Sequence, residues 1–430
     1  MVRRLRDPSH PVSLRIDGKT IVGNEGEPLA AALIACGIDG IARSPKFHRP
    51  RGASCMRGGC DGCVVRVDGV PNVLGCLEPC REGMVVETQN RMGPRDFDLL
   101  RANDWFFPSG MNHHEMFIGV PGAEPFLRIF ARRISGLGHL PDNPMPIVLG
   151  ARRAAGVVVV GAGAAGLAAT VAYAEAGHTV EVLDENVNLD GVLSAHAGED
   201  ADRVGILLAR VRLLAAEGRV IVRPRTRAVG IFSGLLLVES PSGAEVLDAA
   251  FTVLATGAHD GPALFEGNDL PGVYSLRAAR KLVSAGVAPG ARIVIVVHED
   301  TPASSYALAQ ALVADLTAAK VACTLHVGRV VKAHGSSSVR KVTLARAGVE
   351  ETHPADALVV EARRSPSFEL ATQSGATVAR TASGFAVTSH VWAERYAALG
   401  EVTGAEPSVR AFEAAARDLA ARLPVVVPKP

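Results

Sequence analysis

The sequence predicts an α/β protein with a small α+β domain at its N-terminus. Two observations lead to this fold class. Near the N-terminus, short alternating strand-like runs surround a single helical run. From Gly156 onward, valine-rich runs alternate with alanine-rich runs, which is typical of parallel βαβ units with helices on both faces of a sheet. The chain has 430 residues, enough for two or three domains.

The elements of the first domain follow in order. VSLRIDGKTIV reads as a hairpin turning at Asp17-Gly18, and EGEPLAAALIACGI reads as a helix with Pro28 near its first turn. An irregular Gly/Cys/Arg stretch comes next. CVVRVDGVPNVLGC then forms a second hairpin, and MVVETQ a last strand. The order predicts a β-grasp domain over residues 1–92.

The next segment, 93–150, connects this domain to the rest of the chain. It contains DWFFPSGMNHHEMF, a basic helical run and the Pro-rich linker PDNPMPIV. Because adjacent histidines seldom share one metal well, we expect His113, His114 and Glu115 to serve packing or an interface. Residues 151–430 form the third block, with a second βα opening at about 280–370.

Four cysteines in the irregular stretch carry the strongest chemical signal. Cys55, Cys60, Cys63 and Cys76 are spaced C-x4-C-x2-C, then twelve residues, then C. This is the spacing of plant-type 2Fe–2S ferredoxins. Glycines between the ligands suit a loop that aims backbone N–H groups at sulfur. A zinc site usually needs two C-x2-C pairs and only one is present; zinc and an unmetallated loop remain the alternatives.

The other three cysteines, Cys36, Cys80 and Cys323, are expected to pack in the fold. Clustered cysteines indicate metal binding in a reducing compartment. The N-terminus has no apolar run after its charges, and no stretch approaches the roughly 18 apolar residues of a membrane span, so we expect a cytoplasmic protein without one. The net charge of +1 and 4% aromatic content do not favour nucleic-acid binding.

A second motif opens the third block. Gly161, Gly163 and Gly166 form a G-x-G-x-x-G directly after GVVVV and before an alanine-rich helix. This context predicts a dinucleotide site whose pyrophosphate rests on the helix N-terminus, beside Ala164 and Ala165. The next strand ends at Asp184 and Glu185, where an acidic residue accepts hydrogen bonds from a ribose. Asp184 is the first choice.

Three further segments belong to the predicted site or its surroundings. VLATGA, with Thr256 and Gly257, is the turn at which two-domain flavoproteins cross the dinucleotide. LGEVTG places Gly400 and Glu401 near a ribityl or pyrophosphate group, although a surface turn is equally compatible. In the second βα opening, residues 298–300 read His-Glu-Asp where glycines would stand. That half is therefore expected to be structural.

Together these motifs resemble the α subunits of heterotetrameric sarcosine oxidase and their shorter relatives in opine oxidase, hydrogen cyanide synthase and dye-linked proline and hydroxyproline dehydrogenases. The resemblance covers most of the chain. Its motifs are FHRPRG, VDGVPN, GMVVETQN, DWFFPSGM, SGLG, GAGAAG, VLATGA and NDLPGVYS. It implies a β-grasp 2Fe–2S domain followed by a flavoprotein fold of two dinucleotide-binding domains.

The resemblance also implies cofactors and partners. An α-type subunit pairs with an oxidase-type β subunit that carries FAD and oxidises a secondary amine or amino acid, and small extra subunits can join. The chain itself would bind FAD, with NAD as the alternative, and FMN can lie at the interface with the partner. Electrons would leave through the cluster to an external acceptor.

The sequence departs from the family in three places. A C-terminal folate-binding half is absent from this sequence, so formaldehyde transfer to tetrahydrofolate is not expected. Asp190-Gly191 stands where a Gly-Gly pair follows the acidic strand end, leaving Gly191 as the glycine of that pair. EARRSPSFELATQSG lacks the expected Gly-Gly-Trp near the flavin.

The sequence thus predicts an electron-transfer subunit, with oxidation of the substrate on a partner chain; no residue of this chain is assigned a catalytic role. Two alternatives stay open. One is an NAD(P)H-dependent ferredoxin-type flavin reductase, which the His-Glu-Asp loop disfavours. The other is a structural scaffold with an inert dinucleotide.

Overall fold

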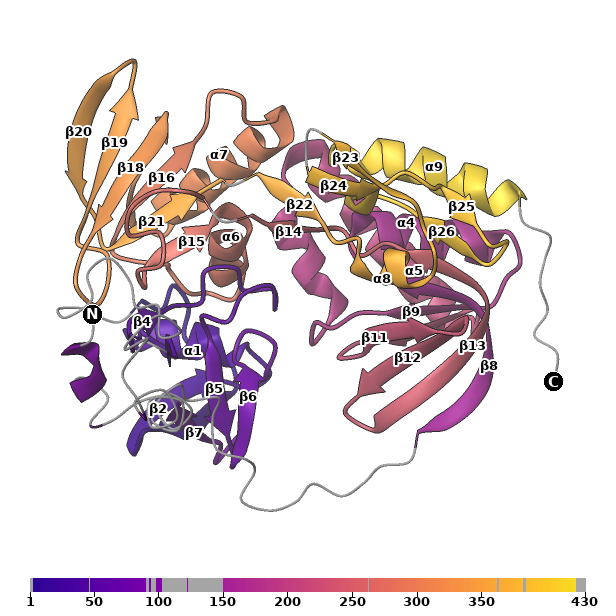
Figure 1. Ribbon diagram of the computed structural model, residues 1–430, viewed down its shortest axis with the longest axis horizontal. Coiled ribbons are helices and arrows are strands. Elements are labelled where there is room, and N and C mark those ends of the chain that lie inside the picture. The colour runs from indigo at the N-terminus through magenta and orange to yellow at the C-terminus, as the bar shows by residue number, and fades with distance from the viewer. Residues whose placement is uncertain are drawn as a thin grey trace. The chain divides into compact units, whose positions relative to one another are not determined.

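The computed structural model describes residues 3–45, 47–89, 93, 98–102, 122, 150–261, 263–361, 363–381 and 384–422 (Figure 1). These residues form two compact units. Unit 1 takes its residues from Met1–Met145, Leu264–Val296 and Leu316–Val360, and unit 2 from Pro146–Ala263, Val297–Asp315 and Glu361–Pro430. Each unit is described separately below. Among the described residues, no helix is long and apolar enough to cross a membrane.

The N-terminal domain in unit 1 is a five-stranded sheet in the order β2-β1-β7-β5-β6. Its elements are β1 (Pro11–Ile16), β2 (Lys19–Asn24), α1 (Leu29–Ala35), β3 (Ala42–Arg43), β4 (Pro50–Arg51), β5 (Val64–Val67), β6 (Val70–Leu74), β7 (Val85–Thr88) and η1 (Leu99–Ala102). Both hairpins turn at Asp-Gly pairs with positive φ at both residues, the backbone that such pairs favour. β1 runs parallel to β7, and every residue of α1 is buried. This is the predicted β-grasp arrangement.

The second part of unit 1 is built on the four-stranded sheet β15-β21-β16-β17 and the three-stranded sheet β18-β19-β20. Its elements are β15 (Val273–Ser275), α6 (Leu276–Ser284), β16 (Arg292–Val297), β17 (Ala322–Val327), β18 (Arg329–His334), β19 (Lys341–Arg346), β20 (Val349–Pro354) and β21 (Ala357–Val360). β15 and β16 both pair in parallel with β21. This is the expected second βα opening, and α7 (Ala303–Ala318), which follows β16, begins in unit 2.

Within unit 1 the N-terminal domain packs on this second part. The Ser275 backbone N–H donates to the Ser54 carbonyl oxygen at 2.9 Å, and Arg51 forms an ion pair with Asp269. A Cβ atom on Gly52 would lie 3.0 Å from the Pro271 Cα atom, so the two backbones approach closely here.

Unit 2 contains an eight-stranded sheet with the path β10-β9-β8-β13-β12-β11, to which β26 and β25 are joined through β13. Its elements are β8 (Ala151–Val160), α4 (Ala164–Glu175), β9 (Val180–Leu183), η2 (Leu189–Ala195), α5 (Gly198–Ala216), β10 (Val220–Arg223), β11 (Arg227–Phe232), β12 (Leu235–Ser240), β13 (Gly243–Leu254), β14 (Ala258–Asp260), β22 (Arg364–Pro366), α8 (Glu369–Gln373), β23 (Val378–Thr381), β24 (Gly384–Val387), β25 (Val391–Trp392), β26 (Tyr396–Ala398), η3 (Glu401–Thr403) and α9 (Val409–Arg422). The strands β10, β9, β8, β13 and β26 run parallel, as the alternating pattern predicts.

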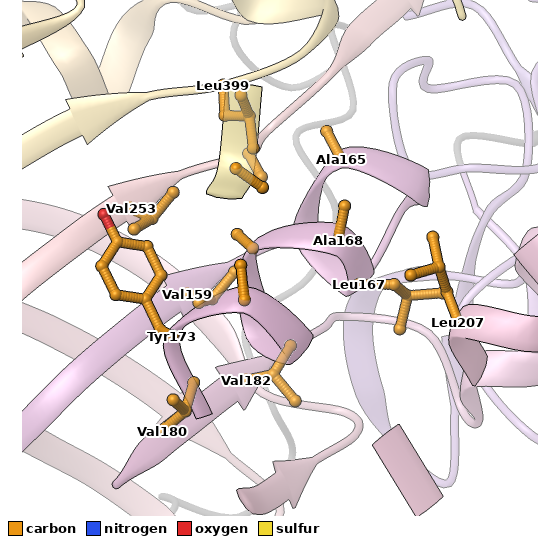
Figure 2. Close-up of a cluster of buried hydrophobic side chains, with 14 of the residues drawn as sticks. Val159, Ala165, Leu167, Ala168, Tyr173, Val180, Val182, Leu207, Val253 and Leu399 are labelled. Carbon is orange, nitrogen blue, oxygen red and sulfur yellow. The ribbon is translucent and has the colours of Figure 1, made fainter. Parts of the chain in front are cut away.

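Both faces of this sheet are buried. Val159 of β8 belongs to one core cluster, which α4, α5 and α9 cover, while its neighbours Val158 and Val160 belong to the cluster on the other face. This two-sided burial explains why the strand reads as an unbroken run of valines. Figure 2 shows the first cluster, in which Leu167 of α4 and Val182 of β9 have no exposed surface.

The predicted fold class is confirmed by these elements and by the structural likeness reported below. The predicted domain boundaries at 92 and 150 remain a prediction, since most of 93–150 lies outside the described residues.

Candidate functional site

The four predicted cluster cysteines lie at one end of the N-terminal domain. Cys55 and Cys60 belong to the loop between β4 and β5, Cys63 directly precedes β5, and Cys76 follows β6. The hairpin of β5 and β6 therefore places the fourth cysteine beside the loop that holds the other three. Cys55, Cys63 and Cys76 are buried, and Cys60 is partly exposed.

The thiols are connected in a chain. The Cys55 thiol interacts with those of Cys60 and Cys76, and the Cys76 thiol also interacts with that of Cys63. Among the described residues, no group of three or more His, Cys, Asp or Glu side chains is arranged to hold a single metal ion. A two-iron cluster divides four thiolates between two metal centres, so its ligands need not converge on one point.

The backbone of the loop is shaped around sulfur. The Arg57 N–H donates to the Cys55 sulfur at 3.4 Å, and the Gly58 N–H donates to the Cys76 sulfur at 3.3 Å. Gly58 has a φ of 76°, which favours glycine. A Cβ atom on Gly62 would lie 1.9 Å from the Gly52 carbonyl oxygen, so no side chain fits there. N–H groups directed at buried thiols fit a 2Fe–2S cluster, whose sulfur ligands accept such bonds.

Burial and mutual contact raise the pKa of the Cys60 and Cys76 thiols, which favours their protonated form when no metal competes. The hydrogen bond with Cys55 and burial both raise the pKa of Cys60 far above its usual range. For Cys76, the bond with Cys55 lowers the pKa, but the bond with Cys63 and burial outweigh it and raise the pKa to about 12. Cluster assembly must therefore displace thiol protons.

The remaining cysteines lie elsewhere in the fold. Cys80 is buried beside the ion pair of Arg4 and Glu27, and burial raises its pKa to about 12. Cys36 and Cys323 are partly buried. The position of Cys80 agrees with the packing role expected from the sequence, while packing roles for Cys36 and Cys323 remain predictions.

The glycine loop of unit 2 connects β8 to α4. Gly161 has a φ of 99°, and a Cβ atom on it would lie 2.5 Å from the Ala255 carbonyl oxygen. A Cβ atom on Gly166 would lie 1.8 Å from the Gly161 carbonyl oxygen, so the helix packs directly on the turn. Gly163 has open space at its Cβ position and is the N-cap of α4, without a side-chain cap bond. Free space before the first N–H groups of a helix fits a pyrophosphate.

Asp184, at the end of β9, is tied to this loop. Its Oδ2 atom accepts a hydrogen bond from the Ala162 N–H at 2.8 Å, and its Oδ1 atom accepts from the Asn186 N–H at 2.8 Å and from the Asn186 side chain at 2.7 Å. A carboxylate oxygen has two lone pairs, so Asp184 retains acceptor capacity for a ribose. Glu185 instead forms an ion pair with Arg227 of β11 at 3.6 Å.

Two further predicted segments lie at the glycine loop: the VLATGA turn and the LGEVTG segment near the C-terminus. The Thr256 hydroxyl donates to the Ser367 carbonyl oxygen at 2.7 Å, and Gly257 has a φ of 70° beside it. A Cβ atom on Gly400 would lie 2.5 Å from the Cβ atom of Ala165, so Gly400 packs on the first turn of α4. Residues from four distant segments are thus gathered at the carboxyl ends of parallel strands.

Sequence reasoning missed the partner of Glu401. The Arg364 Nη1 atom donates to the Glu401 Oε1 atom at 2.6 Å. The only signal was the EARRSPSF segment, which the sequence marks as lacking a flavin motif. Gly191 lies in η2 with open space at its Cβ position, and its neighbour Asp190 pairs with Arg212.

Two other predicted features have different outcomes. His113, His114 and Glu115 lie outside the described residues. In the second βα opening, the His298 side chain is hydrogen-bonded to Asp300, and its backbone N–H donates to the Thr301 hydroxyl at 2.9 Å. Side chains of this loop are thus hydrogen-bonded within the loop, at the positions where a nucleotide-binding loop would have glycines.

Comparison with known proteins gives matches along most of the chain. Residues 9–91 match a family described as a 2Fe-2S iron-sulfur cluster binding domain. Sarcosine oxidase subunit alpha of Rhizobium meliloti (strain 1021) is 29% identical over 414 residues, which cover 87% of this chain and 42% of that subunit. Sarcosine oxidase subunit alpha of Corynebacterium sp. (strain P-1) is 30% identical over 335 residues, covering 73% of this chain and 30% of that subunit.

A shorter relative and a solved structure are also similar to this chain. Hydrogen cyanide synthase subunit HcnA of Pseudomonas aeruginosa is 32% identical over 79 residues, covering 18% of this chain and 75% of that subunit. The crystal structure of L-proline dehydrogenase from P. horikoshii superposes with a TM-score of 0.72 at 21% identity, covering 97% of this chain and 74% of that chain. This likeness shows the fold.

The comparisons agree with the motifs noted in the sequence. The chain spans less than half the length of the two sarcosine oxidase subunits. Its N-terminal domain is of the iron–sulfur cluster binding type, and the chain as a whole shares the fold of the L-proline dehydrogenase. The chain therefore belongs to the family of sarcosine oxidase α subunits and their shorter relatives, a family of oxidoreductase subunits.

Proposed function

We propose that the chain is the electron-transfer subunit of a multi-subunit dehydrogenase or oxidase acting on an amine or amino acid. The observation that carries this proposal is the connected set of four cysteine thiols in the N-terminal domain, joined in one chain to a flavoprotein fold with an open glycine loop. This chain contributes no catalytic residue, and oxidation of the substrate takes place on a partner.

The proposed roles of the residues follow from their positions. Cys55, Cys60, Cys63 and Cys76 hold a 2Fe–2S cluster, which supplies one-electron transfer when bound. The nucleotide in unit 2 is FAD, with NAD as the alternative. Its proposed binding residues are Gly161, Gly163, Ala164, Ala165, Gly166, Asp184, Glu185, Gly191, Thr256, Gly257, Gly400 and Glu401.

The proposed partner is an oxidase-type β subunit that carries its own FAD, together with small additional subunits. Family membership and the names of the sarcosine oxidase and hydrogen cyanide synthase subunits support this proposal. FMN is proposed at the interface with the partner, and an external acceptor receives the electrons. A cytoplasmic location is proposed from the clustered thiols, which a reducing compartment preserves.

Iron and acid-labile sulfide on the purified chain test the cluster. We expect about two of each per chain, as a 2Fe–2S centre requires. Cys63→Ser should lose the visible absorbance and the electron paramagnetic resonance signal of the reduced cluster. The matched variant Cys80→Ser removes another buried thiol outside the set and should retain both. A wild-type chain without iron and sulfide, or an unchanged Cys63→Ser spectrum, would overturn the cluster assignment.

Purification of the complex from its native source tests the electron-transfer role. The partner chain identifies the substrate class, and adding that amine or amino acid should reduce the cluster of the complex within turnover time. The isolated chain should stay oxidised under the same conditions. Reduction of the isolated chain by NADH would support the flavin reductase alternative instead.

A structural scaffold is the second candidate function. The observation that favours it is the closed His298–Asp300 loop in the second βα opening, together with Asp190 in place of a glycine. In a scaffold the nucleotide of unit 2 would be redox-inactive. Extraction of the bound nucleotide distinguishes the two candidates, since NAD or ATP in place of a flavin supports the scaffold.

A further inference from the structure

Arg364 joins three segments of unit 2 that are far apart in the sequence. It is the first residue of β22, which pairs antiparallel with β14, and its register partner there is Asp260 (Figure 1). Its Nη1 atom donates to Glu401 at 2.6 Å, and its Nη2 atom donates to the hydroxyl of Ser305 on α7 at 3.2 Å. Glu361 adds an ion pair at 3.8 Å.

The guanidinium is shielded from water and stays charged. The Arg364 side chain is 16% exposed and that of Glu401 is 18% exposed, while Ser305 is almost fully buried. Burial lowers the pKa of Arg364, but the carboxylates of Glu401 and Glu361 outweigh it, and the pKa is raised overall. A shielded ion pair of this kind is screened by salt much less than an exposed one.

Glu401 directly follows a residue that packs on the helix of the glycine loop. Gly400, the residue before it, packs on Ala165 in the first turn of α4, next to the open space at Gly163. A pyrophosphate in that space would carry two negative charges close to the Glu401 segment. A bare carboxylate there would repel it, because like charges in a partly buried site interact strongly.

We propose that Arg364 is a positioning residue of the nucleotide site, which neutralises and orients Glu401 so that a dinucleotide pyrophosphate can occupy the glycine loop. The proposal rests on the proposed nucleotide site of unit 2. It assigns a role to the segment of the sequence that departs from the family pattern. Arg364 acts on the nucleotide through Glu401, since its hydrogen bonds go to protein groups.

Binding of FAD and of NAD to the full-length chain, stripped of nucleotide, provides the test. Arg364→Gln should weaken binding of the preferred nucleotide at least tenfold, and Arg364→Lys should weaken it less because the charge is kept. The double variant Arg364→Gln/Glu401→Gln should recover most of the lost affinity. Arg395→Gln is the matched control, since it breaks an exposed ion pair with Asp248 in the same unit and should bind like the wild type.

The double variant separates charge neutralisation from a purely structural role. A structural role for Arg364 predicts that the double variant binds as weakly as Arg364→Gln or worse, and that result would overturn the proposal. Arg364→Gln within twofold of wild type would also overturn it.

Failure of the proposed nucleotide site would look different. In that case the wild-type chain binds neither FAD nor NAD, and the inference falls with the site. Iron content and thermal unfolding of every variant confirm that the chain is folded, so that weak binding cannot be mistaken for loss of structure.

Discussion

At the residue scale, the cluster loop depends on backbone atoms approaching more closely than side chains allow. Gly62 faces the Gly52 carbonyl oxygen, and Gly52 in turn approaches Pro271 and the Asp39 carbonyl oxygen. Backbone atoms at these four positions therefore lie against one another in the region of Cys55 and Cys63. Gly52 and Gly62 are needed for this close contact, whereas Gly58 is the glycine of the loop with a positive φ.

Gly62→Ala tests this contact. The added methyl group would overlap the Gly52 carbonyl oxygen, so the loop must shift and the thiols lose their arrangement. We expect loss of at least half of the bound iron and a faster loss of visible absorbance on incubation with a chelator.

The matched control is Gly205→Ala. Gly205 lies in α5 with open space at its Cβ position, and alanine there should keep the iron content and raise helix stability by about 1 kcal/mol or less. Equal iron in Gly62→Ala and wild type would show that the loop tolerates a side chain.

At the element scale, an ion-pair network crosses four neighbouring strands of unit 2. Arg153 of β8 bonds Glu181 of β9 at 2.6 Å and Glu245 of β13 at 3.1 Å, and Arg223 of β10 bonds Glu245 at 2.8 Å. Burial raises the pKa of Glu245, but hydrogen bonds from Arg223 and Arg153 outweigh it and lower the pKa below its usual value. The network links the four strands across the sheet.

Glu245→Gln should destabilise the protein in a pH-dependent way. A carboxylate whose pKa is lower in the folded state contributes stability above its unfolded pKa, about 4.3, and loses it as the pH falls through the folded value. We expect a loss of about 1 kcal/mol in the free energy of unfolding at pH 7, shrinking as the pH falls below about 4. Urea unfolding at pH 7 and at pH 3 measures this difference in the free energy of unfolding.

The control for this prediction is Glu239→Gln, which changes an exposed carboxylate on the adjacent strand β12. It should have little effect at either pH. A Glu245→Gln deficit that stays constant from pH 7 to pH 3 would refute the charge explanation and indicate a packing effect.

At the scale of the whole molecule, the chain divides into two compact units. Each unit is built from three separate segments of the sequence, so the chain passes from one unit to the other several times. Unit 2 has its own buried cores on both faces of its sheet. The cysteine loop belongs to unit 1. Stability of the two units should therefore be separable by probes that report on each of them.

Leu167→Ala tests this separation. Leu167 is fully buried against the sheet of unit 2, and its truncation should cost about 3 kcal/mol of unfolding free energy (Figure 2). On heating, far-ultraviolet circular dichroism should show an unfolding transition at a lower temperature than in the wild type. The cluster absorbance should be lost near the same temperature as in the wild type. Leu213→Ala, at a position 57% exposed on α5, should change neither. A joint shift of both probes would show that the units unfold together.

Local signals in the sequence predicted much of this architecture. The Asp-Gly turns, the C-x4-C-x2-C spacing and the G-x-G-x-x-G after a valine run each depend on residues within one short segment. The structure has the expected hairpins, brings the four thiols together and places Gly163 at the N-cap of α4. Short-range patterns suffice here because backbone conformation and ligand spacing are local properties.

Only the tertiary structure decided which distant segments meet. The sequence by itself determined the fold class, the cysteine set and the glycine loop. The pairing of Arg364 with Glu401, the bond from Ala162 to Asp184 and the contact of Gly52 with Gly62 came from the packed chain. The physical reason is that such contacts form where β-strands and loops are brought together by burial of apolar surface, and no periodicity in the sequence records which partners that burial selects.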